Sequence, residues 1–295
     1  MLVRFVSMSP EMVALIPDMV ATLAGGEPYS ARVLEAARSL KIVARFGVGW
    51  DKVDVAAATK KGVAVAMAFG TNHDAVAEYA FALMLALACN LLANHAKVAG
   101  GGWGATFHAS LAGSTLGLVG LGRIGRAVAS RGQAFAMRVI AHDPAPDRAF
   151  AKAHGIEFVS LETLLSESDF VSLHAPLDAS TRHLIDDQRL RLMKPGAFLI
   201  NTARGGLIDE AALTEALVQG RIAGAGLDVF GREPPVGSKL LSLSNVVFSP
   251  HAASHSARAE VLCANRCIDS ILAVVVDGTS PGTEYLLNPE VLARR

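Results

Sequence analysis

The sequence contains little cysteine and no excess of either charge. Only three of its 295 residues are cysteines, Cys89, Cys263 and Cys267, which argues against a disulfide framework and favours a reducing compartment. Cys263 and Cys267 are four residues apart, but no further ligand pair stands near them, so we predict no metal site. The 27 basic residues equal the 27 acidic ones, which gives no indication of a nucleic-acid or membrane-surface partner.

Long hydrophobic runs are also missing. The longest, residues 79–93, spans about 15 residues, whereas a helix needs about 20 to cross a bilayer. This run contains Asn90, and we interpret it as a buried helix of a soluble, cytoplasmic protein. With 52% apolar residues, the chain can form the cores of about two domains of roughly 150 residues each.

Short runs rich in Val and Ile alternate with Ala-rich stretches, which predicts an α/β protein with two Rossmann-like domains built on doubly wound parallel sheets. The predicted strands are KIVARF, GVAVAMAF, TLGLVG, RVIAHD, DFVSLHA, AFLIN, GAGLDVF and NVVFSP. Asp209 should cap a helix over residues 210–219. A second helix, 256–276, should bury an apolar stripe, with Cys263 and Cys267 beside it: Val261, Ala264, Ile268, Ile271, Leu272 and Val275. The turn-rich segment 99–114 is a plausible hinge.

The segment TLGLVGLGRIGRAVA places Gly120, Gly122 and Gly125 as G-x-G-x-x-G between a predicted strand and a helix. The glycines permit a tight turn, a close approach of the backbone to a pyrophosphate, and close packing of helix and strand. Asp143 ends the next strand and can accept hydrogen bonds from both hydroxyls of a ribose. We therefore predict a dinucleotide site that prefers NAD, with NADP less favoured but tolerable because Arg148 lies nearby.

Three side chains at predicted strand ends suit a nicotinamide enzyme, which needs an anchor for an anionic substrate and a proton donor: Arg204, Glu233 and His251. Arg204 can hold a carboxylate with its planar fork, and a carboxylate beside an imidazole stabilises the protonated ring. Spacing alone leaves His255 and His174 open as the acid, and it also leaves Glu233 open as an ordinary turn residue.

Six motifs in order resemble the D-isomer-specific 2-hydroxyacid dehydrogenases, a family that includes phosphoglycerate dehydrogenase, glyoxylate/hydroxypyruvate reductase and D-lactate dehydrogenase. They are ARFGVGWDKVD, GLVGLGRIGRAVA, SLHAPL, MKPGAFLINTARGGLIDEAAL, GAGLDVFGREPP and NVVFSPHAAS. The resemblance implies that Arg204 binds substrate, that His251 is the acid/base and that Glu233 is its partner. It also implies that Gly47, Val48 and Gly49 offer backbone N–H groups to the substrate carboxylate.

The same resemblance implies an NAD-dependent D-2-hydroxyacid dehydrogenase that interconverts a small D-2-hydroxy acid and its 2-oxo acid. Residues 1–72 and 257–295 would form the substrate domain and residues 73–256 the NAD domain, with a cleft between them. A long helix from Ala75 to about Val98 would lie at the two-fold interface of a homodimer. The implied cofactor contacts are Gly120, Gly122, Arg123, Ile124, Gly125, Asp143, His174, Pro176, Thr202, Ala203 and Asp228.

Two departures from the family pattern leave alternatives open. The chain before KIVARFGVGW is shorter than expected by a few tens of residues, and Gly231 stands where an acidic or small side chain is usual, which would loosen the loop of Glu233. The short N-terminus leaves a catalytically degraded enzyme as one alternative, and the resemblance itself leaves an NAD-binding regulator of the corepressor kind as another. We expect no regulatory domain after residue 295 and therefore no amino-acid feedback. The substrate stays open, since Arg4, Arg32 or Arg45 could meet a phosphate or a second carboxylate.

Overall fold

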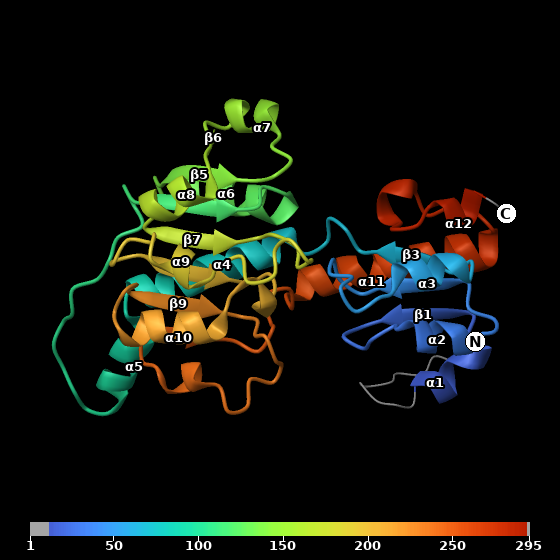
Figure 1. Cartoon of the computed structure of the whole chain (residues 1–295), viewed down its shortest axis with the longest axis horizontal. Coiled ribbons are helices and arrows are strands. Elements are labelled where there is room, and N and C mark those ends of the chain that lie inside the picture. The colour runs from blue at the N-terminus through green and yellow to red at the C-terminus, as the bar shows by residue number, and fades with distance from the viewer. Residues whose placement is uncertain (1–11, 294–295) are drawn as a thin grey trace. The chain divides into compact units, whose positions relative to one another are not determined.

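The computed structural model describes residues 12–293, so Arg4 lies outside the described residues. The chain divides into two compact units (Figure 1). Unit 1 combines residues 1–72 with residues 256–295, and unit 2 is the continuous segment 73–255. Each unit contains a parallel sheet with helices packed against it, which confirms the predicted α/β class.

Unit 2 is built on a seven-stranded parallel sheet in the order β10-β9-β8-β7-β4-β5-β6. Its strands are β4 (Thr115–Val119), β5 (Arg138–His142), β6 (Glu157–Phe158), β7 (Phe170–Leu173), β8 (Phe198–Asn201), β9 (Gly224–Leu227) and β10 (Val246–Phe248). Every predicted strand of this region is confirmed, and only the two-residue β6 was not predicted. The strand order reverses between β4 and β7, and in such sheets ligands bind at the carboxyl ends of the strands beside that switch point.

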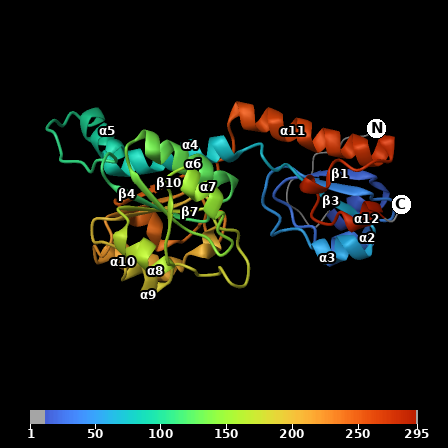
Figure 2. The ribbon, with the colours of Figure 1, turned by 90° about the horizontal axis from the view of Figure 1, so that it is seen from above.

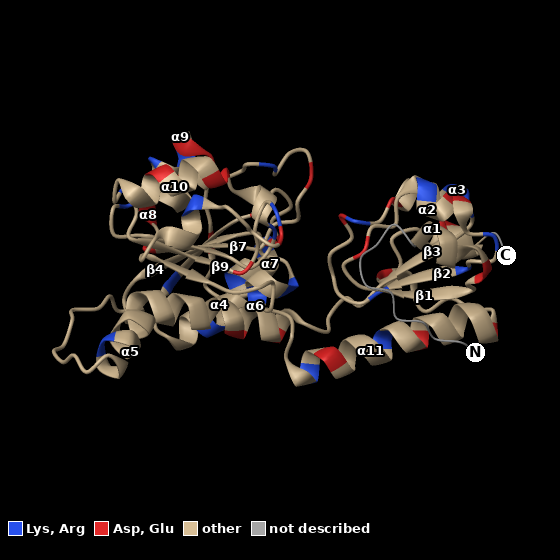
Figure 3. Cartoon of the chain, turned by 90° about the horizontal axis from the view of Figure 1, so that it is seen from below, with Lys and Arg blue, Asp and Glu red and all other residues tan. Residues whose placement is uncertain are grey.

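Helices cover both faces of this sheet (Figure 3). On one face lie α4 (His73–Ala88) and α6 (Arg123–Ala134), and on the other α8 (Leu161–Glu167), α9 (Asp187–Leu190) and α10 (Glu210–Val218), while α7 (Arg148–Ala153) stands near β6. Asp209 caps α10 as predicted, accepting hydrogen bonds from Ala211 and Ala212. Gly226 lets α4 approach β9 closely, since a Cβ there would lie 2.9 Å from the Cβ of Leu83.

The single helix predicted from Ala75 to Val98 is wrong. The chain forms α4 and then α5 (Leu91–Ala99), and the two are bent by 60°. The break occurs at Asn90, whose φ of 50° is left-handed, a conformation that asparagine adopts more readily than most residues. Within residues 12–293, no single helix is long and apolar enough to span a membrane; only the bent pair α4 and α5 together meets that length and composition, and α4 is largely buried in its own unit.

Unit 1 contains, within residues 12–72, the parallel strands β1 (Ala21–Ala24), β2 (Ile42–Arg45) and β3 (Ala64–Met67) in that order. Helices α2 (Ala31–Ala36) and α3 (Val55–Lys60) pack on one face, and α11 (Ala257–Leu272) runs along the other (Figure 2). Short helices α1 (Met12–Leu15) and α12 (Glu290–Ala293) complete the unit. Strand β1 was not predicted, whereas β2 and β3 are confirmed.

The predicted apolar stripe of α11 is confirmed only in part. Ile271 and, just beyond α11, Val275 pack against the core of unit 1. Val261 is 60% exposed and Ile268 49%, whereas Cys263 and Cys267 are buried against Ala44 of β2 and Ala68, which follows β3. Small side chains on this face allow the helix to approach the strands closely. The cysteines therefore form the centre of the packed face rather than its margin.

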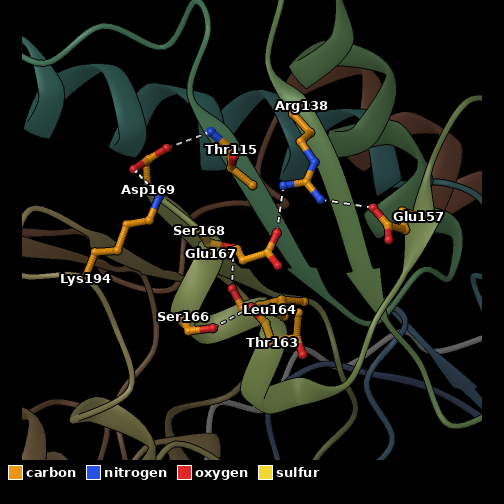
Figure 4. Close-up of polar contacts among 10 residues, drawn as sticks. All are labelled: Thr115, Arg138, Glu157, Thr163, Leu164, Ser166, Glu167, Ser168, Asp169 and Lys194. Atoms are coloured by element: carbon orange, nitrogen blue, oxygen red, sulfur yellow. Dashed lines mark hydrogen bonds and ion pairs between the residues drawn. The ribbon is translucent and has the colours of Figure 1, made fainter.

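The amino-terminal edge of the unit 2 sheet is held by charged side chains (Figure 4). Arg138, at the start of β5, donates to Glu157 and Glu167, while Asp169 accepts from the Thr115 N–H at 2.8 Å and from Lys194 at 2.9 Å. Such exposed pairs contribute about 0–1 kcal/mol each. The side chains predicted to carry chemistry in this unit all follow the opposite, carboxyl ends of its strands.

Candidate active site

The glycine turn between β4 and α6 forms a cradle without side chains. A Cβ at Gly120, whose φ is +97°, would lie 2.8 Å from the His174 carbonyl oxygen, and one at Gly125 would lie 2.2 Å from the Gly120 oxygen. In contrast, no described residue other than the two chain neighbours of Gly122 comes within 4 Å of a Cβ built on this glycine. This open space at the N-terminus of a twelve-residue helix fits a pyrophosphate, which backbone N–H groups and the helix dipole would bind.

Asp143 follows β5 beside this turn. Its Oδ2 accepts from the Leu121 N–H at 2.8 Å, and its Oδ1 accepts from the Ala145 N–H at 2.9 Å. A carboxylate has about four acceptor positions, so two remain for ribose hydroxyls. The acidic side chain is thus oriented by the glycine turn itself, as an NAD site requires.

His174 lies just after β7 and its Nε2 is 2.9 Å from the Ser172 hydroxyl. Burial lowers the pKa of His174 to about 4, so the ring is neutral near pH 7. A neutral imidazole is poorly suited to donate protons near pH 7. Of the three histidines considered as the acid, His251 and His255 therefore remain. Pro176 follows in the same loop, and its carbonyl accepts from the Thr181 hydroxyl at 2.7 Å.

The turn that carries Arg204 is ordered by Asn201, which ends β8 and is fully buried. Its Oδ1 accepts from the Ala203 N–H at 3.0 Å, and its Nδ2 donates to the Arg204 carbonyl at 2.8 Å. The Arg204 side chain itself donates to the Ala203 carbonyl at 2.7 Å. Sequence reasoning missed this role of Asn201, although an asparagine that ends an apolar strand was a visible signal.

Thr202 lies in the same turn and is 7% exposed. Its Oγ1 is buried and has no hydrogen-bond partner within the described residues. A buried hydroxyl without a partner is unfavourable unless a ligand or water satisfies it. This observation fits the predicted contact between Thr202 and the nicotinamide end of a dinucleotide.

The main chain after Arg204 touches the loop that carries Glu233. A Cβ on Gly205 would lie 1.9 Å from the Phe230 carbonyl carbon, so only glycine permits this approach. The predicted looseness at Gly231 is countered by a hydrogen bond, because the Gly231 N–H donates to Glu210 Oε1 at 2.5 Å. Glu210, on the first turn of α10, is a further residue whose role the sequence did not indicate.

Glu233 and His251 meet side by side. Glu233 Oε2 lies 3.0 Å from His251 Nδ1, and the side chains are 34% and 47% exposed, respectively. This contact leaves Nε2 on the other side of the ring. Of the predicted trio, the structure therefore brings these two into direct contact, and it places the Arg204 turn against the loop of Glu233 through Gly205.

The loop of His251 is held by Asp228. This residue follows β9 with 0% exposure, and its carboxylate accepts from the Ser249 hydroxyl at 2.6 Å and from the N–H groups of Ala252 and Ala253 at 2.8 and 3.0 Å. The His251 N–H also donates to the Asp228 carbonyl at 2.8 Å. These bonds maintain His251 at a left-handed φ of 55°, which a non-glycine residue rarely adopts.

The remaining predicted substrate contacts belong to unit 1. Gly47, Val48 and Gly49 follow β2, and Gly47 has a φ of 135°, which favours glycine. The Gly47 carbonyl accepts from the Ala68 N–H at 3.1 Å. Arg32 lies exposed on α2.

Residues 81–253 match the sequence profile of the D-isomer specific 2-hydroxyacid dehydrogenase, NAD binding domain. The chain belongs to this family. The predicted family and enzyme class are thereby confirmed, and the matched segment lies within unit 2, where the glycine turn, Arg204, Glu233 and His251 are found.

The similarity to named relatives extends beyond this domain. The glyoxylate reductase of Korarchaeum cryptofilum is 44% identical over 276 residues, which cover 91% of this chain and 82% of the relative. The hydroxypyruvate reductase of Thermotoga maritima is 44% identical over 256 residues, covering 85% and 83%. The crystal structure of D-lactate dehydrogenase from Aquifex aeolicus, complexed with NAD and lactic acid, superposes with a TM-score of 0.87 at 29% identity, covering 94% and 89%.

Proposed function

We propose that the protein interconverts a small D-2-hydroxy acid and its 2-oxo acid with NAD as cofactor. The observation that carries the proposal is the Glu233–His251 contact of 3.0 Å, made by loops at the same sheet edge as the glycine cradle. The names of the relatives, glyoxylate reductase, hydroxypyruvate reductase and D-lactate dehydrogenase, support a small 2-oxo acid.

In the direction of reduction, NADH when bound supplies the hydride for C2 of the 2-oxo acid. His251 donates the proton to the keto oxygen from Nε2, because Glu233 accepts a hydrogen bond from the opposite ring nitrogen and so orients the imidazole. Arg204 binds the substrate carboxylate and polarises the keto oxygen with its planar fork. The N–H groups of Gly47, Val48 and Gly49 bind the carboxylate as well.

The residues of unit 2 fit the cofactor along its length. Gly120, Gly122, Arg123, Ile124 and Gly125 would hold the pyrophosphate, and Asp143 the ribose hydroxyls. His174 and Pro176 would line the adenine side, with Thr202, Ala203 and Asp228 at the nicotinamide end. A carboxylate at the ribose repels a 2′-phosphate, so NAD is preferred to NADP.

We further propose a homodimer in which α5 and the segment after it contact a second copy. Leu91, Leu92 and Val98 of α5 are more than half exposed, and beyond them Trp103 is 86% and Phe107 fully exposed. Apolar surface of this extent usually marks an interface. The free thiols of Cys89, Cys263 and Cys267 are in keeping with the reducing cytoplasm as its location.

The decisive experiment measures NADH oxidation with glyoxylate, hydroxypyruvate, pyruvate, 2-oxoglutarate and phosphohydroxypyruvate. Fast turnover of one of them is expected. H251N should lower kcat by about 10² to 10⁴ while leaving the Kd of NADH unchanged, the usual range for a lost general acid. H255N is the matched control and should keep its rate; the reverse pattern would make His255 the acid. NADH binding without turnover of any acid would favour the regulatory or degraded alternatives.

A further inference from the structure

The loop that follows β2, residues 46–52, contains two glycines and would be flexible by itself. Its two ends are tied to neighbouring backbone. The Phe46 N–H donates to the Ala24 carbonyl at 2.8 Å, and the Lys52 carbonyl accepts from the Tyr29 N–H at 2.8 Å. These bonds anchor the ends, but they leave the orientation of the peptide groups at Gly47, Val48 and Gly49 to other contacts.

The Arg45 side chain makes two of those contacts. Arg45 is the last residue of β2, and its Nε donates to the Gly49 carbonyl at 2.9 Å. Its Nη1 donates to the Ala24 carbonyl at 2.9 Å and to the Phe46 carbonyl at 3.2 Å. The guanidinium thus joins the end of β1 to the first and last peptide groups of the glycine segment, an arrangement that a rigid planar fork can make and a single ammonium cannot.

Because the peptide bond is planar, a contact that fixes a carbonyl also fixes the direction of the N–H in the same peptide group. In a trans peptide the C=O and N–H point to opposite sides of one plane. Because Arg45 binds the carbonyls of Phe46 and Gly49, the N–H groups of Gly47 and Trp50 are directed away from the guanidinium. The Gly47 carbonyl is likewise held, by the Ala68 N–H, which sets the direction of the Val48 N–H.

Neighbouring groups keep Arg45 in this position. The Cys267 thiol donates to the Arg45 carbonyl at 3.4 Å from the buried face of α11. Tyr29, which is 1% exposed and lies near Arg45, stays an uncharged phenol because burial raises its pKa to about 12. The hydrogen bonds of the Arg45 guanidinium to backbone carbonyls therefore lie within a packed part of unit 1.

We propose that Arg45 is a positioning residue that holds the Gly47–Gly49 loop in the conformation that receives the substrate carboxylate. It does not bind a phosphate group of the substrate. This inference rests on the proposed function, since it requires that the loop binds the carboxylate. It resolves one of the substrate alternatives that the sequence left open.

The test compares R45M and R45K with wild type on every acid that the wild type reduces. For R45M the KM should rise about tenfold or more, or about 1.4 kcal/mol, for unphosphorylated and phosphorylated acids alike. The kcat should change less than about threefold, because Arg45 positions the loop that binds the carboxylate and takes no part in the proton transfer. R45K should show a smaller rise. The Kd of NADH should stay at the wild-type value, because the cradle belongs to unit 2. R38M, which removes an exposed arginine of the same unit, is the matched control and should leave KM unchanged.

Two results would overturn the inference: an unchanged KM in folded R45M, or a loss confined to phosphohydroxypyruvate, which would identify Arg45 as a phosphate ligand. If R45M does not fold, as judged by its Tm, R45K decides, and an unchanged KM in R45K overturns the inference as well. Failure of the proposed function is recognised separately, because wild type would then reduce none of the acids.

Discussion

Replacing Gly122 and Gly125 by alanine, one at a time, should separate damage to the fold from damage to cofactor binding. In G125A the new Cβ would lie 2.2 Å from the Gly120 oxygen, whereas real contacts of this kind stay above 3.0 Å, so two backbone segments must part by at least 0.8 Å. Such overpacking costs about 1–3 kcal/mol, partly offset by the better helix propensity of alanine. For a unit of this size, Tm should fall by roughly 2–8 °C.

G122A is the matched control, because beyond its two chain neighbours no described residue lies within 4 Å of the added methyl group, and φ of −72° suits alanine. Its free energy of unfolding should change by less than about 1 kcal/mol. The methyl group nevertheless occupies the space that a pyrophosphate needs, so the Kd of NADH should rise at least about tenfold, or 1.4 kcal/mol. Thermal unfolding and titration of NADH by fluorescence provide the two readouts. A folded G122A that binds NADH as tightly as wild type would refute the assignment of this turn as the cradle.

Three further outcomes are expected. R204K keeps the charge but loses the planar fork, so kcat/KM should fall at least about a hundredfold at an unchanged Kd for NADH; equal activity would contradict the anchoring role. Because the pKa of His174 falls from 6.5 to about 4 on folding, the unfolded chain takes up this proton first as the pH falls. Above pH 6.5 His174 therefore does not lower the free energy of unfolding. As the pH falls from 6.5 toward 4, that free energy decreases by at most about 3 kcal/mol for this partly exposed ring. H174Q should show a shallower loss of unfolding free energy over that range, and an identical slope would exclude His174 as the cause. A W103S/F107S double variant should be monomeric by light scattering at concentrations where wild type is a dimer, and an unchanged mass would exclude this segment as the interface.

The strands were predictable because each is a short run of Val, Ile, Leu or Phe bounded by glycine, aspartate or proline. Strands β1 and β6 escaped because ATLA and a two-residue pairing carry no such pattern. The break at Asn90 depends on one left-handed residue inside an unbroken apolar run, which periodicity does not register. In the middle of α11, side-chain size was misleading, since Cys263 and Cys267 pack against the sheet where Val261 and Ile268 were expected to.

The residues of the candidate site were also predictable only in part. Arg204, Glu233 and His251 were predictable because charged or titratable side chains at the carboxyl ends of parallel strands lie at the ligand edge of the sheet. Glu210 and Ser249 could not be found in that way, because each bonds to a residue 21 positions away and only the folded backbone brings donor and acceptor together. Asn201 differs, because it bonds within its own turn and its position at the end of an apolar strand was a signal that the prediction did not use.

Unit 1 is assembled from both sides of unit 2 along the chain, and this has a consequence for synthesis on the ribosome. Asn288, which is 1% exposed, bonds through its side chain to Val65, Val63 and Thr59, more than 220 residues earlier. The ribosome adds roughly 5–20 residues per second, so strands β1–β3 emerge roughly 10–40 s before Asn288 and α11 are available to pack against them. Unit 2 is continuous and can fold during that interval, so the apolar face formed by Ala44 and Ala68 is the surface that a nascent-chain chaperone would meet.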